Sequence, residues 1–270
     1  MAAARIRLER IQMLFSGGMA RLILGIQPDG TKLVIRELLP KNVFKWRIHR
    51  GFVKGTGIRE QLTYHPNIVF SVERGYSGLM PYEVIEYVPG SNLRKLIQNK
   101  NPVIKERSFE ILRQASTAIG YMHGRGFIHL DIKAENLLVV ADGDDLTIKL
   151  TDFDLSEELR GERRARYRSG TQSHMAPEQL KHGQLGPGAD IFAFGVMAYN
   201  LVTGRMPFHG ATEKELLWQH LSESHTVTAP RKLNPDLMPR LEWVILRCLE
   251  KDPAKRFPSM SYLRQELSKM

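Results

Sequence analysis

The sequence predicts an α+β fold, with a small, mainly antiparallel β part at the N-terminus and a larger, mainly helical part after it. Runs rich in β-branched and leucine residues, separated by turn signals, fill residues 1–87, and such runs are typical of strands. Beyond them, apolar residues recur at helical spacing. The length of 270 residues exceeds one average domain and suits a chain folded in two parts.

The first part is expected to form a small sheet. Its clearest signal is Gln27-Pro28-Asp29-Gly30, a turn sequence between two apolar runs that predicts a hairpin. A helix before the fourth strand would be weakened by Gly51, Gly55 and Gly57, because glycine costs about 1 kcal/mol relative to alanine inside a helix. The expected strands are Ile11 to Phe15, Met19 to Ile26, Lys32 to Leu38, Ile68 to Val72 and Tyr82 to Tyr87.

The second part begins after a connector around Val88 to Asn92. Apolar residues at helical spacing predict one helix over Lys105 to His123. Two short strands are expected around Leu137 to Val140 and Leu146 to Leu150. We therefore divide one domain, residues 1–270, into a first lobe (1–87), a hinge (86–91) and a second lobe (92–270), with a nucleotide expected in the cleft between lobes.

Composition places the chain among globular proteins. Its apolar fraction is 42% and its charged fraction 25%, as is usual for this class. The longest apolar run, Ile191 to Val202, is too short to span a bilayer, and no signal segment opens the chain, so we expect a cytoplasmic protein or domain. The single Cys248 excludes an internal disulfide and is expected to be a buried apolar side chain.

The formal net charge is +10, which favours acidic partners. Five arginines gather between Arg160 and Arg168. They form either a solvated loop or a patch for an acidic or phosphorylated partner. Tyr167 is the one aromatic residue among them, so there is no repeated interleaving of aromatic and basic residues, and no nucleic-acid motif occurs; nucleic acid is therefore not an expected partner.

The most informative segment is His129-Leu130-Asp131-Ile132-Lys133-Ala134-Glu135-Asn136, followed by Asp152-Phe153-Asp154. Phosphoryl transfer requires positioning and cations around a spreading negative charge. Asp131 could accept the proton of a hydroxyl and Lys133 could neutralise the phosphate. Asn136 and Asp152 offer the oxygen ligands that Mg²⁺ prefers.

This pair resembles the protein-kinase motifs H-R-D-x-K-x-x-N and D-F-G. Other segments are similar to later kinase motifs: Gly170 to Glu178, Asp190 to Gly195, Leu201 to Phe208 and Cys248 to Arg256. The chain as a whole resembles bacterial eukaryotic-like Ser/Thr protein kinases. The resemblance implies a bilobal protein-kinase-like fold, with structural roles for Glu178, Asp190 and Arg256, the first and last of these forming a pair.

The resemblance also implies ATP and Mg²⁺, with Mn²⁺ as an alternative, and a protein substrate whose identity is open. The implied catalytic residues are Asp131, Lys133, Asn136 and Thr171, and the implied metal ligands are Asn136 and Asp152. The implied nucleotide-binding residues are Gly17, Gly18, Leu22, Val34, Arg36, Ile85, Glu86, Val88 and Leu138. Lys133 with Gly170-Thr171 favours Ser/Thr over Tyr acceptors.

Several letters depart from the family pattern. Arg36 stands where a phosphate-binding lysine belongs, and arginine is a planar fork rather than a compact point charge. Thr56 stands where the family carries a glutamate on the helix named C, which forms an ion pair with the phosphate-binding lysine. In this chain that ion pair is absent, is replaced by a pair between Arg36 and Glu60, or forms only when a partner is bound. The other departures are Phe15 and Ala20 for two loop glycines, Leu130 for an arginine, and Asp154 for a glycine, where it could bind metal or repel its neighbours.

Three functions fit these observations. The first is an active Ser/Thr protein kinase whose ATP alignment or regulation is altered, because the catalytic groups are retained. The second is a pseudokinase that binds nucleotide or a protein partner as a signalling scaffold, because the phosphate-binding positions are changed. The third is an atypical phosphotransferase acting on a non-protein acceptor.

Overall fold

A computed structural model describes residues 6–8, 10–159, 172–181 and 183–270 of the chain. They form two compact units: Met1–Pro89 with Asp152–Asp154, and Gly90–Thr151 with Leu155–Met270. The sequence boundaries put Asp152–Asp154 in the second lobe. The structure groups this segment with the first unit, because it packs against that unit's long helix.

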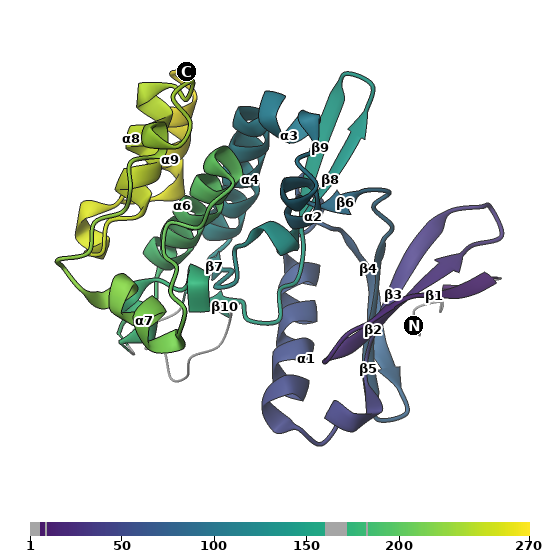
Figure 1. Ribbon diagram of the computed structural model, residues 1–270. Coiled ribbons are helices and arrows are strands. Elements are labelled where there is room, and N and C mark those ends of the chain that lie inside the picture. The colour runs from purple at the N-terminus through teal and green to yellow at the C-terminus, as the bar shows by residue number, and fades with distance from the viewer. Residues whose placement is uncertain (1–5, 9, 160–171, 182) are drawn as a thin grey trace. The chain divides into compact units, whose positions relative to one another are not determined.

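The first unit is a five-stranded antiparallel sheet with the strand order β1-β2-β3-β5-β4 (Figure 1). Helix α1 (Trp46–Gln61) packs against β4 and β5. The other elements are β1 (Arg10–Ser16), β2 (Ala20–Ile26), β3 (Lys32–Leu38), the 3₁₀ turn η1 (Pro40–Asn42), β4 (Ser71–Ser77) and β5 (Met80–Glu86).

The predicted hairpin turn between β2 and β3 is present. The Gly30 N–H donates to the Gln27 carbonyl at 2.9 Å, and the Thr31 N–H donates to the Asp29 carboxylate at 2.8 Å. Gly30 has a φ of 87°, a left-handed conformation that glycine adopts without steric cost. The sequence Pro-Asp-Gly therefore fixes this turn by chemistry that is local to it.

Two predicted elements differ from those observed. The strand expected over Ile68 to Val72 begins at Ser71 instead, and Ile68 and Val69 enter the core from the preceding loop. The helix expected from Lys105 to His123 is broken at Arg107, whose side chain pairs with Glu110 and with the Asp144 carbonyl. In both cases the apolar run correctly indicates which residues are buried, but it does not indicate where the strand or helix begins.

The second unit is mainly helical (Figure 1). Helix α4 packs against α6, α9 and β9. The helices are α2 (Leu93–Gln98), α3 (Pro102–Glu106), α4 (Ser108–Gly124), α5 (Pro177–Leu180), α6 (Pro187–Thr203), α7 (Glu213–Leu221), α8 (Pro239–Cys248) and α9 (Met260–Leu267). The 3₁₀ turns are η2 (Ala134–Asn136), η3 (Gln172–His174), η4 (Pro230–Lys232) and η5 (Pro253–Lys255).

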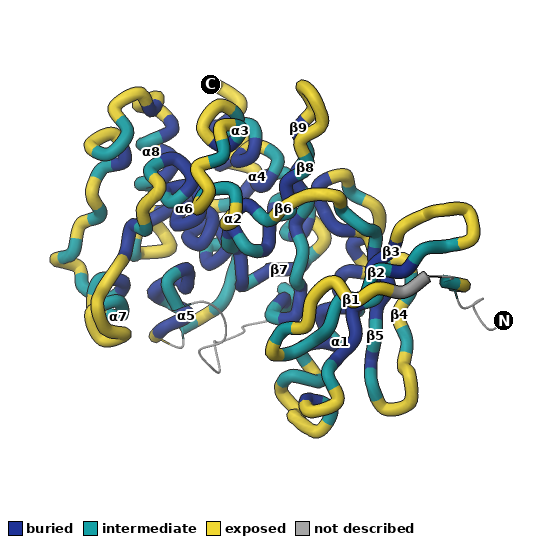
Figure 2. The backbone as a smooth tube through the Cα atoms, turned by 45° about the vertical axis from the view of Figure 1, so that its right-hand side comes forward, coloured by how far each residue is buried: buried dark blue, intermediate teal, exposed yellow. Residues whose placement is uncertain are grey.

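Short strands complete the second unit: β6 (Ser91–Asn92), β7 (Phe127–Ile128), β8 (Leu137–Asp142), β9 (Asp145–Leu150) and β10 (Glu157–Glu158). They form the sheets β6-β8-β9 and β10-β7. Helix α6 is apolar nearly all round and buried along almost its whole length (Figure 2), as expected of a helix inside a core. Among the described residues, no helix combines the length and the apolar character that crossing a bilayer requires.

Candidate active site

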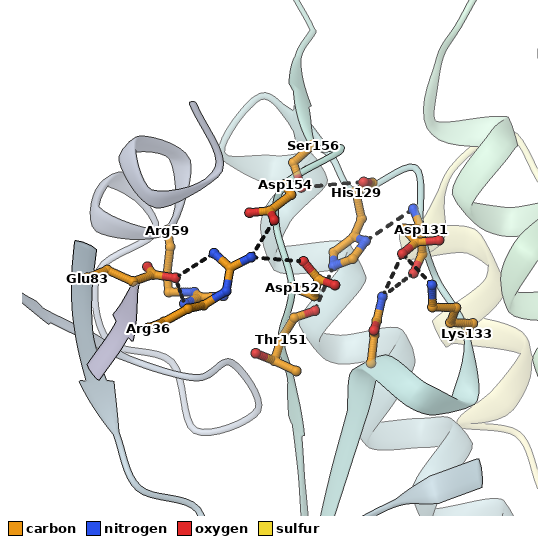
Figure 3. A network of polar contacts seen from close by, with 11 residues as sticks. Arg36, Arg59, Glu83, His129, Asp131, Lys133, Thr151, Asp152, Asp154 and Ser156 are labelled. Carbon is orange, nitrogen blue, oxygen red and sulfur yellow. Dashed lines mark hydrogen bonds and ion pairs between the residues drawn. The ribbon is translucent and has the colours of Figure 1, made fainter. Parts of the chain in front are cut away.

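The second unit carries a polar loop, His129–Asn136, which we name the Asp131 loop (Figure 3). Asp131 is its centre. The Lys133 Nζ donates to Asp131 Oδ2 at 2.7 Å, and the Asn136 Nδ2 donates to the same oxygen at 3.0 Å and to the Asp131 carbonyl at 2.8 Å. The carboxylate, the ammonium and the amide that the sequence singled out therefore form one hydrogen-bonded group.

Asp190, from the buried helix α6, holds the start of this loop. Its carboxylate accepts the N–H groups of His129 and Leu130 at 2.8 and 2.7 Å, and it lies 2.8 Å from the Nε2 of His123. Burial alone would raise the pKa of Asp190, but these donors hold it below the usual range. A buried anion on a rigid helix thus fixes the backbone that leads to Asp131.

Leu130 adopts a left-handed conformation, with a φ of 64°. For a residue other than glycine this costs about 1–2 kcal/mol. The hydrogen bond from its N–H to Asp190 is strong enough to offset that cost, because a bond to a charged acceptor contributes about 1.5–3 kcal/mol. Left-handed conformations of residues other than glycine concentrate at functional sites, so the conformation of Leu130 supports a functional role for this loop.

His174, in η3, is another buried titratable residue of the second unit. Its burial, together with the charges of Lys133 and Arg94, lowers its pKa to about 4. The side chain is therefore neutral at pH 7, and it adds no positive charge to the surroundings of Lys133.

The predicted structural residues Glu178 and Arg256 lie in a bidentate ion pair. The two guanidinium Nη atoms contact the two carboxylate oxygens at 2.7 and 2.8 Å. Arg256 also donates to the carbonyls of Gly188 and Glu250 and lies over the Phe192 ring. Planar two-point pairing of this kind fixes orientation as well as distance.

The first unit holds a charge cluster, which we name the Arg36 cluster (Figure 3). Its members are the buried residues Arg36, Arg59, Glu83 and Asp154 and the partly exposed Asp152. One guanidinium nitrogen of Arg36 donates to Glu83 at 3.1 Å, and the other pairs with Asp154 and lies 3.7 Å from Asp152. Arg59 donates to the same Glu83 oxygen at 2.7 Å. Two guanidinium groups and three carboxylates give the cluster a formal charge of −1.

Strand register explains why Arg36 meets Glu83. The two residues are direct partners on β3 and β5, so their side chains lie on one face of the sheet. Thr56, at the position where a helix glutamate was expected, is buried and donates its hydroxyl to the Val53 carbonyl. Glu83 therefore supplies, from a strand, a carboxylate that the helix lacks.

Of the alternatives for the partner of Arg36, the pair with Glu60 is not the one observed. Glu60 lies on the exposed side of α1 and pairs with Arg74 at 2.7 Å. The buried face of the helix contains Phe52, Gly55, Thr56 and Arg59, at the spacing i, i+3, i+4, i+7. Arg59 is thus turned inward, one turn beyond Thr56, while Glu60 is turned away.

The helix glycines have a packing role. A Cβ atom on Gly55 would lie 2.7 Å from the Phe153 carbonyl oxygen and 2.9 Å from the Asp154 Cα, and one on Gly51 would lie 3.1 Å from the Asp154 carbonyl oxygen. These glycines let the Phe153–Asp154 backbone lie directly against α1. Helix α1 runs through all three glycines that were expected to weaken it, because close packing compensates for their low propensity.

Burial and neighbouring charges shift the pKa values in the Arg36 cluster. Burial alone would lower the pKa of Arg36, but Asp154, Glu83 and Asp152 together raise it above its ordinary value. Burial raises the pKa of Asp154; Arg36 opposes this rise and Asp152 adds to it. Asp154 is thus held by a cation within the protein instead of standing open as a metal ligand.

The glycine loop between β1 and β2 is positioned by a buried asparagine. The Asn42 Nδ2 donates to the carbonyls of Gly18 and Met19 at 2.8 and 3.0 Å, and the Gly17 N–H donates to Ala20 at 3.0 Å. Apart from its neighbours in the chain, no described residue has an atom within 4 Å of where a Cβ on Gly18 would be. An open, fixed loop of this kind suits a phosphate group.

The predicted adenine contacts are distributed over several strands. Leu22 is on β2, Val34 on β3, and Ile85 on β5 opposite Val34. The Glu86 N–H donates to the Phe70 carbonyl, and Val88 follows β5. Leu138 belongs to the second unit, on β8 opposite Asn92.

Thr171 and the Arg160–Arg168 segment lie outside the described residues. Four other residues of the two units were missed by the sequence reading: Asn42, Arg59, Glu83 and His174. A glutamate inside a run that reads as a buried strand, as in Tyr82-Glu83-Val84-Ile85, was a usable signal, because a buried charge requires a partner.

Comparison with known proteins places these features in a family. Residues 8–267 match the family described as the protein kinase domain. The chain is 28% identical over 211 residues to serine/threonine-protein kinase PknB of Mycolicibacterium smegmatis. The aligned region covers 75% of this chain and 33% of that protein. It is 27% identical over 265 residues to probable serine/threonine-protein kinase PknB of Lactococcus lactis, covering 97% and 42% of the two chains.

A third relative is serine/threonine-protein kinase pkn3 of Myxococcus xanthus. The identity is 29% over 269 residues, which cover 96% of this chain and 49% of that protein. The chain therefore spans between about a third and a half of the length of these relatives.

Proposed function

The chain belongs to the protein kinase domain family, and we propose that it transfers the γ-phosphoryl group of ATP to serine or threonine hydroxyls of a protein substrate. The observation that carries the proposal is the Asp131 loop, in which a carboxylate, an ammonium and an amide meet on a backbone anchored by Asp190. The relatives support the choice of acceptor, since they are named serine/threonine-protein kinases. ATP as the donor makes the cytoplasm the expected compartment.

Each group of the Asp131 loop has a distinct proposed role. Asp131 accepts the proton of the incoming hydroxyl, and Lys133, 2.7 Å from it, also neutralises the transferring phosphate. Asn136 is oriented by its two bonds to Asp131. Thr171 is proposed to help position the acceptor. Phosphoryl transfer depends on this kind of positioning and charge stabilisation more than on covalent chemistry.

A magnesium ion would be held by Asn136 and Asp152, with nucleotide phosphates as further ligands. The donor set suits it: both side chains offer oxygen, and the net charge of −1 on the Arg36 cluster favours a cation beside Asp152. Manganese would accept the same donors. When bound, the metal neutralises negative charge on the phosphates.

We propose that Arg36 aligns the nucleotide indirectly, as a positioning residue. Its two nitrogens are engaged by Glu83 and Asp154, so it fixes the segment that carries Asp152. The remaining nucleotide contacts are proposed at Gly17, Gly18, Leu22, Val34, Ile85, the Glu86 carbonyl, the Val88 amide and Leu138. Because residue 36 is an arginine held by Glu83 and Asp154, and not a lysine that contacts the nucleotide phosphates, turnover is expected to be lower than in kinases with a lysine at this position.

The same engagement of Arg36 favours a second candidate, a pseudokinase that binds nucleotide or a partner without measurable transfer. Incubation with magnesium and labelled ATP, read by intact mass, separates the candidates. Phosphate on the protein or on an added substrate, lost in Asp131→Asn, supports the kinase. A rise in melting temperature with ATP and no transfer supports the pseudokinase, and a nucleotidyl adduct would point to the atypical phosphotransferase.

Arg36→Lys tests the indirect role. A single ammonium cannot reproduce two bonds from a planar fork, so the variant is expected to weaken ATP-induced thermal stabilisation, although lysine is the letter usual in the family. Tighter ATP binding by Arg36→Lys would contradict the role given to Arg36.

A further inference from the structure

The first unit carries an unusual surface at the start of helix α1, which we name the α1 entry surface. It borders an open hollow of about 570 Å³, a volume within the range of about 300–1,000 Å³ that is typical of ligand sites. None of its residues belongs to the Asp131 loop, the Arg36 cluster or the proposed nucleotide contacts. The lining residues are Val43, Phe44, Trp46, His49, Arg50, Val53 and Lys54.

Two large aromatic side chains stand exposed on the α1 entry surface. Phe44 is 88% exposed and Trp46 is 63% exposed. Arg50 lies over the Trp46 ring, with its guanidinium carbon 5.6 Å from the ring centroid. Tryptophan and arginine are the residues most enriched at the energetic centres of protein interfaces, and a hollow beside them gives a partner side chain somewhere to insert.

Charge on this segment has one sign. From Lys41 to Arg59 the sequence contains six lysine and arginine residues and no aspartate or glutamate. Of these, Arg59 is directed inward to Glu83, whereas Arg50 and Lys54 line the hollow. The surface therefore attracts anions at the same place where it offers apolar contacts.

We infer that the α1 entry surface binds an acidic, aromatic-containing segment of another protein. The basic side chains complement its carboxylates, which steers association. The hollow and the exposed rings accept its aromatic side chains. The hollow argues for a peptide rather than for an anionic bilayer, because it can accept side chains of a partner, whereas binding to a bilayer requires only protruding apolar side chains.

The test uses the full chain and the labelled synthetic peptide EDDFEDFDE, with binding followed by fluorescence anisotropy. Two control peptides replace either the phenylalanines by serine or the acids by their amides. We expect both controls to bind at least about tenfold more weakly, since each loses one of two contributions of roughly 1.4 kcal/mol or more. Equal binding of the serine control would overturn the inference, because attraction would then be purely electrostatic.

Two variants test the location. Phe44→Ser/Trp46→Ser is expected to raise the Kd at least about tenfold. Arg50→Glu/Lys54→Glu is expected to do the same and to remove most of the salt dependence. The matched control Lys255→Glu/Tyr262→Ser changes an exposed basic and an exposed aromatic residue of the other unit and should leave the Kd unchanged.

Circular dichroism and thermal melting check that each variant is folded, and the peptide controls on the unaltered chain do not depend on any variant. Unchanged peptide binding in both surface variants would overturn the inference. So would binding to phosphatidylglycerol vesicles that requires Phe44 and Trp46 when the peptide does not bind, because the surface would then be a membrane contact.

Discussion

Glu83 holds the Arg36 cluster together, and its removal should be costly. Glu83→Gln keeps the shape of the side chain and deletes a charge that two guanidinium groups share. Glu83 is fully buried and Arg59 is 2% exposed. Arg36 would keep its contacts with Asp154 and Asp152, whereas Arg59 would lose the carboxylate it contacts through Nη1.

Breaking a buried pair in this way costs about 3–5 kcal/mol, because a desolvated charge is left uncompensated. At roughly 2–4 °C per kcal/mol for a chain of this size, the melting temperature should fall by roughly 6–20 °C. Differential scanning calorimetry and urea denaturation would both measure the loss.

The chain offers a matched control in Glu60. The Glu60–Arg74 pair has the same 2.7 Å separation as Glu83–Arg59, but its two side chains are 53% and 41% exposed. Glu60→Gln should therefore cost under about 1 kcal/mol. If the two variants were destabilised equally, burial would not be what gives the Arg36 cluster its strength, and our account of it would be refuted.

Two further predictions concern packing and pH. Gly55→Ala should destabilise the chain by about 1–3 kcal/mol, because the new Cβ would lie 2.7 Å from the Phe153 carbonyl oxygen. Gly57→Ala should be neutral or stabilising by up to about 1 kcal/mol, because its Cβ would meet only the end of a flexible arginine side chain, at 3.1 Å. Equal urea midpoints for the two variants would contradict this prediction. His174 and His220 are neutral in the fold, with burial as the main cause of pKa values near 4 against 6.5, so the stability they contribute is complete above pH 6.5 and is lost as the pH falls toward 4. At pH 5 each should cost about 2 kcal/mol, and His220→Gln should flatten the dependence of the unfolding free energy on pH between 7 and 5; an unaltered slope would show that His220 is not one of the titrating groups.

Some parts of the fold were predictable because their signals are local. The turn at Gly30 and the apolar helix α6 follow from turn chemistry and composition within a few residues. The polar residues of the Asp131 loop were likewise found from their chemical types and spacing. The hydrogen bond that the Leu130 N–H donates to Asp190 joins residues 60 apart in sequence. The resemblance to a family could therefore suggest the role of Asp190, but local sequence patterns could not.

Other parts depended on packing that the sequence does not display. Thr56 and Glu60 are four residues apart, so either could face inward on an isolated helix. The choice is made by Gly51 and Gly55, which bring one face of α1 against the Phe153–Asp154 backbone. With that face fixed, Arg59 points inward and Glu60 outward. The glycines that seemed to weaken the helix therefore determine which of its charges are buried.

The residues of the first unit that depart from the family pattern, Arg36, Thr56 and Asp154, are best explained together, as parts of one rearranged set of ion pairs. Without a helix carboxylate at Thr56, a cation at residue 36 needs another anion, and Glu83 provides it from the facing strand position. A glycine at residue 154 would have no side chain to accept a hydrogen bond from the second guanidinium nitrogen of Arg36. A lysine at residue 36 has a single nitrogen, so it could not bind Glu83 and Asp154 through separate nitrogens as Arg36 does. The positions of Arg36, Glu83 and Asp154 thus depend on one another. Glu83, on strand β5, thus holds the Asp152 segment through Arg36, and the Asp152 side chain, which is 39% exposed, is the one that we propose as a metal ligand.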